Sequence, residues 1–82
     1  MPNKAKAATV PDVRTLIDFM EEYQGMMRDA QQGVKRVLAL NPQAEKFWDE
    51  LTDVATKISL VGNRSDTLWD EIVRLIDELP DD

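Results

Sequence analysis

Carboxylates are the residues of this chain with the clearest chemical potential, because sixteen of its 82 residues are Asp or Glu. Two carboxyl groups can carry out acid–base catalysis when an apolar pocket shifts the pKa of one of them. Here every Asp and Glu falls on the polar side of a predicted helix, where no such pocket is expected. The chain also has no His and no Cys, which removes the commonest general base and the thiol nucleophile. We therefore expect no enzymatic activity.

The residues needed for other catalytic, metal-binding and phosphate-binding motifs do not occur at the required spacing. Ser59 and Ser65 have no His that could activate them as nucleophiles. A calcium-binding loop starting at Asn63 would need Gly and Glu at its sixth and twelfth positions, where Leu68 and Arg74 stand. The three glycines are isolated, so there is no glycine-rich phosphate loop. We expect neither a metal nor a cofactor.

The negative charge is concentrated near the end of the chain. The formal net charge is −6, and residues 66–82 hold seven acidic residues against Arg74 alone. At 100° per residue, the acidic side chains of residues 66–79 share the solvent side of an amphipathic helix. A solubilising surface with i,i+4 pairs to Arg74 is one interpretation. The functional interpretation is a docking surface for a basic partner protein, formed by Asp66, Asp70, Glu71, Asp77 and Glu78.

Three functions remain open after these exclusions. The leading hypothesis is a small acidic protein–protein interaction module, such as a regulator, inhibitor or adaptor, that docks through the acidic surface. The alternative is an inhibitor that mimics nucleic-acid charge and occupies the groove of a DNA- or RNA-binding protein, since the acidic pairs repeat every seven residues. The third possibility is a purely structural, self-assembling helical protein.

Direct binding to DNA or RNA is not expected. The predicted helix of residues 64–79 is acidic, so phosphate groups would repel it. The basic clusters are limited to Lys4 with Lys6 and the pair Lys35-Arg36. Two adjacent basic residues at the end of a helix are favourable against its dipole and need no ligand.

The first predicted helix covers residues 10–40. Thr9 is its predicted N-cap, with Pro11 and Asp12 in the first turn. Gly33 falls on its polar side, and Gln31-Gln32-Gly33 is the expected position of any kink. From Val13 onward, apolar residues follow one another at steps of three and four, as at the a and d positions of a coiled coil. We call this set the seam: Val13, Leu16, Met20, Tyr23, Met27, Ala30, Val34 and Val37.

Two further helices are predicted over residues 42–61 and 64–79. Asn41-Pro42 is typical of an N-cap followed by the first helical residue, and Gly62 is well placed to end a helix. Helices joined by short loops return alongside one another. The sequence therefore predicts a single all-α domain over residues 9–80, folded as a three-helix antiparallel bundle.

The first predicted helix is longer than either of the others, so part of its seam would stay uncovered. An apolar stripe of that length is unusual on a monomer. We therefore expect a homodimer that associates through the long helix. The residues expected to carry self-association are Met20, Tyr23, Met27 and Val34.

The two ends of the chain are predicted to lie outside the helical domain. Residues 1–8 carry Lys4 and Lys6 and lack the apolar core of a targeting segment, so we expect a disordered basic arm. Residues 81–82 form an acidic tail. No apolar run approaches the roughly 18–20 residues of a membrane-spanning helix. We expect a cytoplasmic protein that does not bind a membrane.

Overall fold

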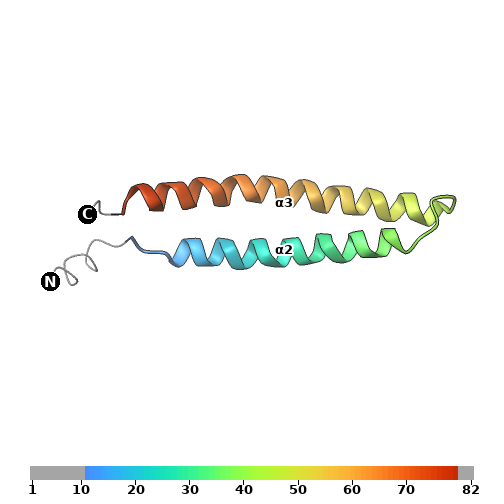
Figure 1. Cartoon of the computed structure of the whole chain (residues 1–82), viewed down its shortest axis with the longest axis horizontal. Coiled ribbons are helices and arrows are strands. Elements are labelled where there is room, and N and C mark those ends of the chain that lie inside the picture. Colours follow the sequence, from blue (N-terminus) through green and yellow to red (C-terminus); the bar gives the residue numbers. More distant parts are fainter. Residues whose placement is uncertain (1–10, 80–82) are drawn as a thin grey trace.

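The computed structural model describes residues 11–79 and shows two antiparallel helices joined by a short turn (Figure 1). The 25-residue α2 covers Arg14–Leu38, and the 33-residue α3 covers Glu45–Asp77. No residue in this part of the chain lies in a β-strand, so the all-α prediction is confirmed. The two helices pack side by side and form a helical hairpin.

Asp12 organises the start of α2. Its carboxylate accepts a hydrogen bond from the backbone N–H of Arg14 at 3.0 Å and pairs with the Arg14 guanidinium at 2.6 Å. The side-chain hydrogen bond from Arg14 lowers the pKa of Asp12 to about 2. Its stabilising effect is therefore present above the ordinary pKa of 3.8 and is lost as the pH falls toward 2. The predicted N-cap Thr9, the arm of residues 1–8 and the tail of residues 81–82 lie outside the described residues.

The turn between the helices is closed by Asn41. Its side-chain Oδ1 accepts a hydrogen bond from the backbone N–H of Gln43, and its carbonyl accepts one from Ala44, both at 2.8 Å. Because Asn41 shapes this turn rather than a helix cap, α3 begins at Glu45 and not at residue 42. The indole Nε1 of Trp48 donates a hydrogen bond to the carbonyl of residue 42 at 3.0 Å and secures the turn.

The predicted three-helix bundle is wrong, because residues 42–61 and 64–79 belong to one helix. α3 continues through Gly62 and Asn63 without a break. No glycine in the described part of the chain has a positive φ, so Gly62 does not take the left-handed conformation that would end a helix. The longer partner of the hairpin is therefore α3, not the first helix.

Packing against α2 explains why α3 stays continuous. Val54, Leu68 and Leu75 are buried on one line of seven-residue spacing that runs on both sides of Gly62. Keeping Gly in a helix interior costs about 1 kcal/mol, whereas burying one large aliphatic side chain stabilises by about 1.5–3 kcal/mol. Breaking α3 would remove half of this line from α2, so the helical conformation of Gly62 is retained.

α2 turns a different set of residues toward α3 than the sequence predicts. Ala30 and Val37 are buried as expected, but Met20 and Met27 are each 42% exposed. α2 also runs through Gly33 without a kink, and Gly33 is buried rather than solvent-facing. Half of the predicted seam is therefore confirmed and half is wrong. The residues of α2 that are buried or half-buried are Leu16, Phe19, Tyr23, Met26, Ala30, Gly33 and Val37.

Gly33 explains why α2 turns this set of residues toward α3. A Cβ atom at Gly33 would lie only 2.6 Å from Cγ2 of Val54, far inside van der Waals contact. The helices therefore approach closely at this point because residue 33 has no side chain. Val54 is 2% exposed, the smallest value among the core residues, so this contact forms the best-packed part of the hairpin.

Replacing Gly33 with Ala is expected to destabilise the hairpin by about 1 kcal/mol, although Ala favours helix. Overpacking costs about 1–3 kcal/mol and exceeds the gain in helix propensity of about 1 kcal/mol. Gly62→Ala is the matched control, since a Cβ there meets no atom within 4 Å, and it should be stabilising. Urea unfolding followed by circular dichroism measures both. Equal stabilisation by the two substitutions would contradict the close contact at Gly33.

Candidate interaction surface

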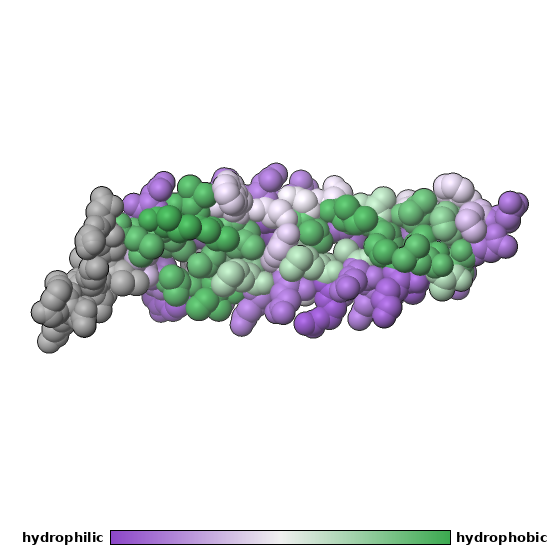
Figure 2. Space-filling view, in the orientation of Figure 1, coloured by the Kyte–Doolittle hydropathy of each residue, from purple (hydrophilic) through white to green (hydrophobic). Residues whose placement is uncertain are grey.

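Large apolar side chains remain exposed along one face of the hairpin. Figure 2 shows hydrophobic surface that runs over both helices between hydrophilic borders. We call this surface the apolar face. Its large exposed residues are Val13, Ile17, Met20, Met27, Val34 and Leu38 from α2 and its N-terminal boundary, and Trp48, Leu51, Ile58, Trp69, Ile76 and Leu79 from α3 and the residues that follow it.

The two helices build this face together. In α2, Ile17 and Met20 follow the inward-facing Leu16 by one and four residues, so they lie beside it on one flank of the helix. Shallow grooves join this flank to α3. One groove is lined by Pro11, Val13, Leu16, Ile72, Leu75, Ile76 and Leu79, and a second by Ile17, Met20, Glu21, Tyr23, Gln24, Met27 and Leu68.

The heptad positions of the apolar face carry no charge. The inward-facing residues are spaced by seven: Leu16, Tyr23, Ala30 and Val37 in α2, and Phe47, Val54, Val61, Leu68 and Leu75 in α3. The positions one and four residues after each of these, together with Val13, hold no Asp, Glu, Lys or Arg. In a chain in which 32% of the residues are charged, a helix flank that faced water would carry some of them. The polar residues at the heptad positions of the apolar face within α2 and α3 are Gln24, Gln31 and Ser65. The pattern is typical of a surface that is covered.

The opposite side of the hairpin carries ion pairs between the helices. Nε of Arg36 lies 3.6 Å from Oε2 of Glu50, and Nη2 of Arg64 lies 3.5 Å from Oε1 of Glu22. Solvent-exposed pairs of this kind stabilise by about 0–1 kcal/mol. They mark this side as the one that faces water, in contrast to the apolar face.

Of the four residues predicted to mediate self-association, Met20, Met27 and Val34 are exposed on the apolar face, whereas Tyr23 is half-buried and lines one of its grooves. The half-buried Tyr23 hydroxyl forms a hydrogen bond with the hydroxyl of Ser65 in α3. A shift of one helix along the other would remove this bond, at a cost of about 0.5–1.5 kcal/mol. The pair therefore specifies how the two helices align.

The five residues of the predicted acidic surface are divided into two groups. Arg74 pairs with Glu71 at 2.7 Å and with Glu78 at 2.6 Å, and the Glu71 side chain is only 13% exposed. The hydrogen bond to Glu71 raises the pKa of Arg74, so its charge persists and offsets these carboxylates. The other three residues are exposed and form no ion pair within residues 11–79: Asp66, Asp70 and Asp77.

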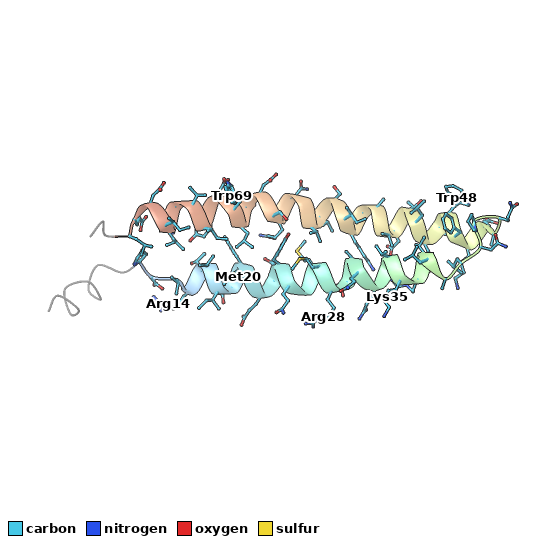
Figure 3. All side chains as sticks on the ribbon, in the orientation of Figure 1. Arg14, Met20, Arg28, Lys35, Trp48 and Trp69 are labelled. Carbon is cyan, nitrogen blue, oxygen red and sulfur yellow. The ribbon has the colours of Figure 1, made fainter. Side chains whose placement is uncertain are left out.

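Three of the basic side chains of α2 lie away from α3. Figure 3 shows Arg14, Arg28 and Lys35 projecting from the outer border of α2, whereas Trp48 and Trp69 belong to α3. These three charges thus lie at the border of the hairpin. Sequence reasoning missed Ile17, Ile58 and Trp69 as surface residues, although the uncharged heptad positions could have indicated them.

Within residues 11–79, no group of three or more Asp or Glu side chains is arranged to hold a metal ion. Over the same residues, neither helix contains a stretch that is long and apolar enough to cross a membrane. The apolar face is the candidate interaction surface of the hairpin. No protein-family model, no curated protein and no solved structure matches this chain.

Proposed function

We propose that this chain is a non-enzymatic protein–protein interaction module that binds α-helices of its partner through the apolar face. The observation that carries the proposal is the continuous run of uncharged heptad positions, with exposed Ile and Met side chains on α2 and exposed Ile and Trp side chains on α3. A layer of two helices buries an apolar side most effectively against a second layer of helices. The sequence contains no His and no Cys, which leaves neither an imidazole nor a thiol for catalysis.

Docking of a basic partner on the acidic residues of α3 is the second candidate. Its support is that Asp66, Asp70 and Asp77 are exposed and unpaired within residues 11–79. Such side chains can steer a basic partner toward α3, with an association rate that falls as salt rises. The pairing of Glu71 and Glu78 with Arg74 lowers the charge available for this role and for nucleic-acid mimicry. The proposed location for either function is the cytoplasm.

A photo-crosslinking residue placed at single positions distinguishes the two surfaces. We expect protein adducts in the source cells when the crosslinker replaces Ile17 or Ile58, which are exposed on the apolar face. Replacement of Asp70 tests the acidic surface, and replacement of the exposed Gln32, on neither surface, is the matched control. Adducts restricted to position 70, or equal yields at position 32, would contradict binding through the apolar face.

A further inference from the structure

The apolar face requires an occupant whenever the chain is folded, because the hairpin alone has a very small core. Within residues 11–79, five hydrophobic side chains are buried, and more than twice as many large ones remain exposed. A single layer of two helices leaves one flank of each helix without a packing partner, whereas stable domains have at least two layers. The occupant must therefore be available from the moment the chain is made.

We infer that this occupant is a second copy of the same chain, so that two hairpins stack through their apolar faces into a four-helix bundle. The inference rests on the proposed function, since it names the partner of the same surface. A second copy meets the requirement of constant availability. It also supplies the chemistry that the face needs, which is an uncharged apolar layer of two antiparallel helices.

The size of the apolar face matches what a stable dimer buries. At 1.5 Å per residue, the overlapping parts of α2 and α3 are about 40 Å long. The hairpin is 17 Å wide. The footprint is thus on the order of 700 Å² for each chain, comparable with the roughly 800 Å² per partner of a standard stable interface. A peptide or a single helix would cover only part of this surface.

The apolar face is also self-complementary. Its polar positions, Gln24, Gln31 and Ser65, lie between the apolar residues toward the two ends of the hairpin. Figure 2 shows paler surface there, between hydrophobic regions toward the two ends. A two-fold axis through the interface matches a surface with itself, so it can place apolar ends on apolar ends and the polar middle on the polar middle. The charged outer borders stay outside the contact.

Light scattering on the purified full chain tests the inference. We expect a mass of twice 9.4 kDa for the natural sequence, and one chain for the double variant Met20→Lys, Met27→Lys. The double variant Gln32→Lys, Thr56→Lys adds the same charge at exposed residues off the apolar face and should remain dimeric. A natural chain of single mass at all concentrations, or a dimer that survives the Met20 and Met27 changes, would overturn the inference.

A crosslinking measurement covers the case in which the lysine variant fails to fold. The natural chain is made with photo-methionine, and ¹⁴N- and ¹⁵N-labelled chains are mixed before irradiation. Crosslinks from Met20 or Met27 that join a light to a heavy chain are the expected result. Crosslinks confined to one chain would overturn the inference. If the Ile17 and Ile58 positions then still crosslink another protein in cells, the proposed function stands and only the second-copy assignment fails.

Discussion

Replacing Val54 with Asp is expected to abolish the helical hairpin at room temperature. Val54 is 2% exposed and packs against Gly33, so an aspartate there would be removed from water. The Arg36 guanidinium beside Gly33 already lies 3.6 Å from the Glu50 carboxylate. Burying a further charge costs several kcal/mol, which is comparable with the total stability of a small domain. Far-ultraviolet circular dichroism should show the loss of most helical signal.

Thr56→Asp is the control for this substitution. It introduces the same charge two residues along α3, at an exposed position whose hydroxyl makes only a 3.4 Å hydrogen bond to the carbonyl of Thr52. We expect a change in stability within about 0.5 kcal/mol, as is usual for surface substitutions. A folded Val54→Asp protein, or equal destabilisation by the two variants, would show that Val54 is not the centre of the core.

Dilution of the natural protein is expected to lower its melting temperature. If folding is completed by a second copy, each hundredfold dilution removes about 2.7 kcal/mol of apparent stability. For two chains of 82 residues this corresponds to a decrease in Tm on the order of 10 °C. Thermal unfolding followed by circular dichroism over a range of protein concentrations measures the effect directly.

A double variant that adds charge outside the apolar face is the control for the dilution experiment. The variant Gln32→Lys, Thr56→Lys should keep the full dependence on concentration, because both residues are exposed and lie off the apolar face. A melting temperature that does not change with the concentration of the natural chain would mean that the hairpin unfolds as a monomer. The apolar face would then be covered by something other than a second copy.

The sequence by itself determined the helical class and the antiparallel return of the chain. Both depend on local signals, which act over a few neighbouring residues. Apolar residues at steps of three and four indicate amphipathic helices, and Asn41-Pro42 indicates that a second helix starts there. Met20, Met27 and Val34 are exposed, but the predicted reason is wrong, because α3 and not the first helix is the longer one. The helical class and the antiparallel return required no knowledge of distant contacts.

The tertiary structure alone decided which apolar line of α2 turns inward. α2 carries apolar residues on two overlapping lines, one through Met20 and Met27 and the other through Phe19 and Met26, so periodicity cannot choose between them. The choice depends on the absence of a side chain at Gly33, which lets α3 approach to contact. Because the contacting residue is Val54, 21 positions away, no local pattern could indicate it.

The continuity of α3 was likewise decided by tertiary contacts. Gly62 and Asn63 favour the end of a helix when only their neighbours are considered. In the folded chain, Ser65 is bonded to Tyr23, and Leu68 and Leu75 are buried on the same line as Val54. The free energy of burying this line against α2 exceeds the local cost at Gly62, so one long helix replaces two short ones and leaves the apolar face open along the hairpin.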